Sequence, residues 1–234
     1  MDYVKHIENW DNKYCEKHVI EMCNNISQIF LSKNISIINY IDIGANVGKV
    51  YDILGKILQI DRAYLFEPSP ILYKYLSEKF EQNPSVSTYH CAVYKEEKMI
   101  SMDESFMISQ MSQSEYNDLN LGMSTISQFD KGNIPAIPIS KFLNDNESLY
   151  DIINFIKIDT ETVDLEILED LLTVIDKFSV KPIIEFEKNY SRKGRTDDDC
   201  QAVLNLFFNH GYQNLDIRTS CPSCDGLLKP LYLV

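Results

Sequence analysis

The sequence predicts an α/β protein with a mostly parallel sheet, helices on both faces and an antiparallel pair of strands at the C-terminus. Short apolar runs rich in β-branched residues alternate with helical stretches through most of the chain. These runs are apolar almost throughout, as strands covered on both faces are. A short turn separates the last two runs, which favours an antiparallel hairpin at the edge of the sheet.

The elements follow one another in a regular order. Apolar residues three and four positions apart predict an amphipathic helix within residues 12–33. We expect strands at 37–44, 63–67, 86–93, 154–159, 181–187, 212–218 and 227–234. Helices are expected at 47–60, 69–81, 163–177 and 197–210. The chain would thus consist of an N-terminal helical segment, 1–36, packed on one main domain, 37–234.

One segment, residues 101–134, does not fit the alternation. It is rich in Ser, Asn, Asp, Gln and Met and carries little periodicity. A long insert inside a compact domain is usually a functional loop or lid. We expect short strands beside it, at 98–102 and 135–140, and a contribution of the insert to substrate choice.

Charge and composition exclude several classes of protein. The 234 residues are 44% hydrophobic and 24% charged, with a net charge of −13. A field of this sign repels nucleic acids and anionic membranes. The chain shows no apolar run of membrane-spanning length, no signal peptide and only scattered cysteines. We therefore expect a cytoplasmic protein with no nucleic-acid and no membrane partner.

The end of the first strand carries the strongest functional signal. Asp42 precedes a turn in which Gly44 and Gly48 let the backbone approach a ligand closely. Glu67 ends the second strand, where a carboxylate can accept both hydroxyls of a ribose. Nicotinamide dinucleotides prefer three glycines, so a nicotinamide-linked oxidoreductase is the weaker alternative. An aspartate before the turn better suits S-adenosylmethionine, whose ammonium and sulfonium are positive.

Four runs in order, IDIGANVG, LFEPSP, IKIDTETVDLEIL and PIIEFE, resemble the FkbM-type family of S-adenosylmethionine-dependent methyltransferases over about residues 38–190. The resemblance implies a Rossmann-like, seven-stranded methyltransferase sheet with a reversed last strand. It implies S-adenosyl-L-methionine as cofactor, S-adenosylhomocysteine as product, and O-methylation of a sugar hydroxyl on a glycan or nucleotide sugar. The cofactor-binding residues that it implies are Asp42, Gly44, Asn46, Gly48, Glu67, Ser69, Cys91 and Ala92.

The fourth strand supplies the candidate catalytic residues. Lys157 and Asp159 alternate with apolar residues and therefore point to one side of the strand. Asp159 or Glu161 could remove the proton of the acceptor hydroxyl, and Lys157 could adjust the pKa of Asp159. A purely structural Lys157–Asp159 ion pair is the alternative. The glycine and the last glutamate of the family's pattern are replaced here by Thr162 and Asp164.

These departures leave two further hypotheses open. The chain could be a non-catalytic, S-adenosylmethionine-binding regulatory or interaction protein, or it could methylate a small molecule that is not a sugar. Asp159, Glu161 and Asp164 are oxygen ligands that could hold a divalent metal, although we expect no metal site. Cys221 and Cys224 could bind zinc or form a disulfide, but two ordinary turn cysteines are the simpler interpretation.

Candidate acceptor contacts lie around this edge of the sheet. Ser124 falls in the insert, and Glu187 ends the fifth strand on the same face as Glu185. Arg192 and Arg195 belong to a basic run that could grip the diphosphate of a nucleotide sugar, or could simply be a solvated loop. We expect a small-molecule or glycan acceptor and, through the N-terminal helix, a possible homodimer.

Overall fold

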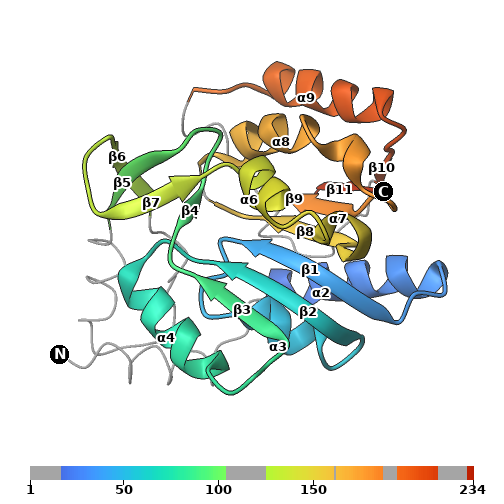
Figure 1. The fold of residues 1–234 in the computed structure, drawn as a ribbon. Coiled ribbons are helices and arrows are strands. Elements are labelled where there is room, and N and C mark those ends of the chain that lie inside the picture. The colour runs from blue at the N-terminus through green and yellow to red at the C-terminus, as the bar shows by residue number, and fades with distance from the viewer. Residues whose placement is uncertain (1–16, 104–124, 161, 187–193, 216–230) are drawn as a thin grey trace.

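The computed structural model describes residues 17–103, 125–160, 162–186, 194–215 and 231–234, and all structural statements concern these residues. Their main feature is a seven-stranded sheet, called the large sheet below (Figure 1). Its strands are, in spatial order, β10 (Asn214–Leu215), β11 (Leu231–Leu233), β9 (Ile183–Phe186), β8 (Phe155–Ile158), β1 (Ile37–Ile43), β2 (Gln59–Phe66) and β3 (Val86–Tyr89).

The strand directions confirm the predicted fold class. β11 runs antiparallel to β9 and β10, whereas the other neighbouring strands are parallel. The last strand lies between β9 and β10, so the C-terminal hairpin places its first strand, and not its second, at the edge of the sheet. This is the reversed last strand that the family resemblance implies.

Helices cover both faces because the buried strands alternate their side chains. One face carries α2 (Lys17–Ser32), α3 (Lys49–Leu54) and α4 (Pro70–Phe80), and β1 contributes Ile38 and Tyr40 to that core. Ile41 and Ile43 point to the other face and pack in the core with residues of the later helices. Those helices are α6 (Ile139–Asp145), α7 (Leu149–Ile152), α8 (Asp164–Leu172), the 3-10 helix η1 (Ile175–Lys177) and α9 (Asp197–Asn209).

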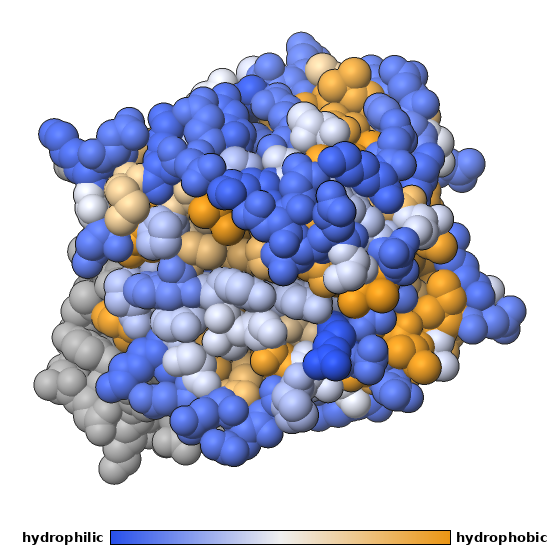
Figure 2. Space-filling view, viewed as in Figure 1, coloured by the Kyte–Doolittle hydropathy of each residue, from blue (hydrophilic) through white to orange (hydrophobic). Residues whose placement is uncertain are grey.

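The N-terminal helix α2 packs on the large sheet through a continuous apolar stripe. Cys23, Ile26 and Phe30 are buried, and the ring of Phe30 meets Phe155 edge-on at 6.2 Å between centroids. None of the helices in the described part of the chain has the length and apolarity that crossing a bilayer requires. On the side of the molecule shown in Figure 2, hydrophilic residues dominate and apolar residues emerge in patches between them.

A second, four-stranded sheet, called the small sheet below, stands beside the large one. It consists of β4 (Ala92–Val93), β7 (Ile134–Ile137), β5 (Lys98–Asp103) and β6 (Thr125–Phe129), in that order. β5 confirms the strand expected at 98–102, whereas β6 was not predicted. The strand expected at 135–140 is shorter, because Pro138 already caps α6.

Several boundaries differ from those that the sequence predicts. The helix expected at 47–60 ends at Leu54, and β2 begins at Gln59 with polar residues that still pair with β1. The expected strand 86–93 divides into β3 and β4. The helix expected at 163–177 breaks after Leu172, and α6 and α7 were not predicted.

Candidate active site

A cavity opens where the carboxyl ends of β1, β2 and β8 meet the small sheet. It contains about 670 Å³ of space, part of it open to solvent. Gly44, Asn46, Glu67 and Asp159 form its polar side. The small sheet contributes apolar residues opposite them, namely Ala92, Val93, Met102 and Ile126.

The turn after β1 owes its shape to residues with positive φ. Gly44 has φ 81°, and a Cβ atom there would lie 1.9 Å from the carbonyl oxygen of Asp159. At Gly48, with φ 75°, a Cβ atom would lie 2.6 Å from the ring of Phe80. Asn46 also has a positive φ, 53°. Glycine is therefore required at Gly44, because the β1 turn and the end of β8 touch through their backbones.

Glu67 joins this turn to the start of α4. Its Oε2 accepts a hydrogen bond from the backbone N–H of Asn46, and its Oε1 accepts one from Ser69, both at 2.8 Å. Burial raises the pKa of Glu67 to about 7, and the two hydrogen bonds only partly oppose that rise. Each carboxylate oxygen keeps a free lone pair, so Glu67 can still accept hydroxyl donors in the cavity.

Ser69 has a different position from the one that the resemblance implies. It is fully buried and caps α4, with its Oγ accepting from the N–H of Leu72 at 3.2 Å. It is not among the residues lining the cavity, whereas Cys91 and Ala92 are. Burial raises the pKa of the Cys91 thiol to about 12, so this side chain acts as an apolar contact.

Lys157 connects the two strand ends from behind the cavity. Its Nζ donates to Asp42 Oδ1 at 3.1 Å and to the carbonyl oxygen of Gly44 at 3.3 Å, and lies 3.4 Å from Asp159 Oδ2. The predicted Lys157–Asp159 pair is thus present. Burial disfavours the ammonium, but the nearby carboxylates of Asp42, Asp159 and Glu185 outweigh it and raise the pKa of Lys157.

Asp42 and Lys157 do not themselves line the cavity. Asp42 is fully buried and Lys157 nearly so. Burial raises the pKa of Asp42, although Lys157 opposes that rise. Lys157 therefore meets the cavity lining through the backbone of Gly44 and the carboxylate of Asp159, and Asp42 does so through Lys157. Of these three acidic or basic side chains, Asp159 is the one that lines the cavity.

Glu185 is buried inside the large sheet, a position that the sequence did not predict. The alternation along its strand suggests the rim of the site, but Glu185 is fully buried opposite Lys157 in the β8–β9 register. The signal was present in the sequence as a glutamate inside the apolar run PIIEFE. Recognising it requires knowing which residue of the neighbouring strand stands opposite.

The turn after β8 is closed by Thr160 and Asp164. Asp164 Oδ1 accepts from the backbone N–H of Thr160 at 2.9 Å and from its Oγ1 at 3.0 Å. Burial raises the pKa of Asp164 to about 7. Thr162 is not among the described non-glycine residues with positive φ, which are Asn34, Asn46 and Asp130. The turn therefore forms without the glycine of the family's pattern. Among the described residues no group of three or more potential ligands could hold a metal ion.

Arg195 pairs with α8. Its Nη2 lies 2.5 Å from Glu169 Oε1, so an anionic acceptor would compete with this carboxylate. The remaining predicted site residues fall outside the described part of the chain: Glu161, Ser124, Glu187, Arg192, Cys221 and Cys224.

The strand order, the reversed last strand and a cavity at the carboxyl ends of β1, β2 and β8 define an α/β domain of the methyltransferase class. A family model described as "Methyltransferase FkbM domain" matches residues 42–213. The chain therefore belongs to the FkbM methyltransferase domain family. No curated protein matches the sequence.

Two solved structures with low sequence identity share the fold, and a third is less similar. Methyltransferase FkbM from Methylobacillus flagellatus KT is 17% identical with a TM-score of 0.54, over 85% of this chain and 44% of that one. The methyltransferase domain of bacterial CtHen1-CN is 10% identical with a TM-score of 0.50, over 91% and 97% of the two chains. Aeropyrum pernix fibrillarin, with natively bound S-adenosyl-L-methionine, is 11% identical with a TM-score of 0.47, over 84% and 66%. The chain thus spans less than half of the Methylobacillus protein.

Proposed function

We propose that this domain is an O-methyltransferase that methylates a sugar hydroxyl of a glycan or a nucleotide sugar. The observation that carries the proposal is the position of Asp159. Its carboxylate lines the cavity with its side chain 30% exposed, and Lys157 holds it from behind. A hydroxyl acceptor must lose its proton as the new bond forms, and a held carboxylate at this place can accept it.

The chain's own residues fit the cofactor. Glu67 can accept the ribose hydroxyls, and Cys91 and Ala92 offer an apolar surface beside the adenine. Asn46 Oδ1 is buried without a hydrogen-bond partner among the described residues, and Asn46 lines the same cavity. The turn containing Gly44 would face the methionine end, with Asp42 acting through Lys157. When bound, the cofactor supplies an electrophilic methyl group.

In the proposed reaction the acceptor oxygen forms a bond to the methyl carbon as the carbon–sulfur bond breaks. The hydroxyl proton passes to Asp159, directly or through Glu161. Lys157 positions Asp159, since its Nζ lies 3.4 Å from Asp159 Oδ2. Our proposed acceptor contacts remain Ser124, Glu187, Arg192 and Arg195. Arg195 would have to leave its partner Glu169 to bind an acceptor.

We further propose that the protein is cytoplasmic and forms a homodimer through α2. Support for the dimer comes from two large apolar side chains that α2 leaves exposed, Ile20 at 36% and Leu31 at 49%. Light scattering on wild type and Leu31→Glu tests it. A dimer that the substitution dissociates supports the proposal, and a wild-type monomer contradicts it.

The catalytic proposal is tested with Asp159→Asn and labelled cofactor on a panel of glycans, nucleotide sugars and other small molecules. We expect methylation of a sugar in the panel, and a turnover about 10²–10⁴-fold lower in Asp159→Asn. Calorimetry should show S-adenosylhomocysteine binding within about threefold of wild type, because the fold of the turn is kept.

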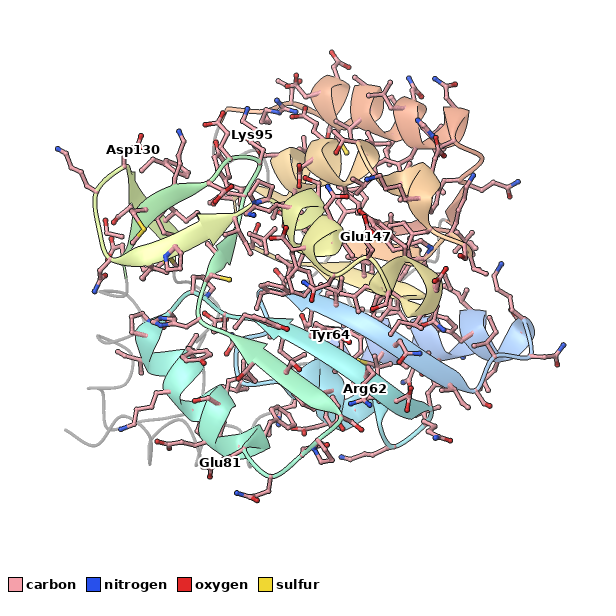
Figure 3. The ribbon with its side chains drawn as sticks, viewed as in Figure 1. Arg62, Tyr64, Glu81, Lys95, Asp130 and Glu147 are labelled. Atoms are coloured by element: carbon pink, nitrogen blue, oxygen red, sulfur yellow. The ribbon has the colours of Figure 1, made fainter. Side chains whose placement is uncertain are left out.

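Asp130→Asn is the matched control, since Asp130 lies at the tip of the small sheet with its side chain 71% exposed (Figure 3). It should turn over like wild type. Unchanged turnover in Asp159→Asn would remove Asp159 from the mechanism. Methylation confined to acceptors that are not sugars would contradict the proposed acceptor class.

A further inference from the structure

Three charged side chains stand side by side across the large sheet. Asp42 on β1 is opposite Lys157 on β8, and Lys157 is opposite Glu185 on β9. Their exposed fractions are 0%, 4% and 0%. Buried charges are costly unless they are paired. We call Asp42, Lys157 and Glu185 the charged row.

The charged row holds more acid than base. The three N–H donors of Lys157 are directed to Asp42, to the carbonyl of Gly44 and to Asp159. Glu185 adds a third carboxylate whose charge acts on the same ammonium. In the described part of the chain one ammonium therefore faces three carboxylates.

These carboxylates lie around Lys157, directly behind the cavity. Gly44 and Asp159, which Lys157 contacts, both line it. Charges in a poorly solvated wall act over several ångströms because little water screens them. A cationic ligand in the cavity would be attracted, whereas a neutral ligand of the same shape would not.

We propose that the charged row selects the ligand of the cofactor site by its charge. Within the row, Glu185 is a specificity-determining residue that favours S-adenosyl-L-methionine over S-adenosylhomocysteine without contacting either ligand. The inference rests on the proposed function. The two ligands differ by one methyl group and by the positive charge on sulfur. The attraction that helps to bind the cofactor therefore disappears once its methyl group has left, which favours release of the product.

The test measures both dissociation constants by calorimetry in wild type, Glu185→Gln and Glu147→Gln. Glu185→Gln keeps the side-chain shape and removes one negative charge. The ratio of the S-adenosylhomocysteine Kd to the S-adenosyl-L-methionine Kd should fall about three- to tenfold, through weaker binding of the cation alone. Glu147 is exposed on the outer surface (Figure 3), and its substitution makes the same change in net charge, so the ratio should stay at the wild-type value.

A structural role for Glu185 predicts a different result. Both ligands would then bind more weakly by the same factor, and an unchanged ratio overturns the proposal. If Glu185→Gln does not fold, Asp42→Asn serves as the second variant. In unaltered protein, sinefungin, which carries a protonated amine in place of the sulfonium, should bind more tightly than S-adenosylhomocysteine, and equal affinities overturn the proposal. If neither S-adenosyl-L-methionine nor its product binds wild type, the proposed function fails together with it.

Discussion

The two walls of the cavity are built in different ways. The polar wall consists of strand ends of the large sheet, where Gly44 touches Asp159 through the backbone and Glu67 is fixed by two N–H groups. The apolar wall belongs to the small sheet, whose own core contains, among the residues that the structure describes, the four buried side chains of Ala92, Ile100, Ile134 and Ala136. We infer that substitutions in the polar wall strongly reduce stability or cofactor binding, whereas the apolar wall accepts substitutions with small effects.

The largest effect should follow from Gly44→Ala. The new Cβ would lie 1.9 Å from the carbonyl oxygen of Asp159 at a φ of 81°, so the two strand ends must separate. We expect a loss of roughly 3 kcal/mol or more in unfolding free energy and loss of cofactor binding. Urea denaturation and calorimetry measure both.

Gly194→Ala is the matched control for this substitution. Gly194 also has a positive φ, 75°, but a Cβ there would meet nothing within 4 Å. It should cost only the strain of the left-handed conformation, about 1 kcal/mol. If Gly44→Ala lowered the unfolding free energy no more than Gly194→Ala does, the inference that the polar wall is more rigid than the apolar wall would be wrong.

A second, intermediate effect concerns Glu67 and pH. Its pKa is about 7 in the free protein, and ribose hydroxyls donating to it would favour the ionised form. Binding should therefore release a proton, so cofactor affinity rises with pH up to about 7 and levels off above it. Glu67→Gln should weaken binding about tenfold or more and flatten the profile. Calorimetry from pH 5.5 to 8.5 measures this.

Asp164→Asn controls for the other carboxyl with a similar pKa, about 7. Its Oδ1 is already engaged by Thr160, so this variant should keep the wild-type slope. A pH profile that survives in Glu67→Gln but is lost in Asp164→Asn would assign the titration to Asp164 and contradict the role given to Glu67.

The smallest effect should follow from Met102→Ala on the apolar wall. Met102 lines the cavity and is half-buried. We expect the cofactor Kd to change less than threefold and stability to fall by about 1 kcal/mol, while the KM of the acceptor rises severalfold. Met99→Ala on the same strand is the control, because Met99 is exposed at 44%. A large loss of cofactor affinity in Met102→Ala would show that the two walls are not independent.

The polar wall was largely predictable because its signals are local. Gly44 and Asn46 fall within the turn that Asp42 and Gly48 flank, and Glu67 follows the next strand of a parallel pair. Strand, turn and helix follow directly in the chain, so their relative positions need no knowledge of distant segments. The contact of Lys157 with Asp159 was predictable for the same reason, since two positions along a strand share a face.

The features that the sequence did not predict depend on residues far apart in the chain or on very short elements. The burial of Glu185 follows from the register of β1, β8 and β9, which the sequence does not display. α6 and α7 are too short for helical periodicity to be distinguished from other patterns. The first half of β2 is polar and exposed, so its pairing with β1 left no apolar signal.

The small sheet has one further property that concerns engineering. Asp103 at the end of β5 pairs with Thr125 at the start of β6, so the chain leaves and re-enters the sheet at neighbouring positions. The entropy of closing a loop across a fixed base grows only with the logarithm of its length. Segments of other lengths and compositions can therefore replace residues 104–124 while the pairing of β5 with β6 is kept, so exchanging this segment between family members would test whether it contributes to acceptor choice.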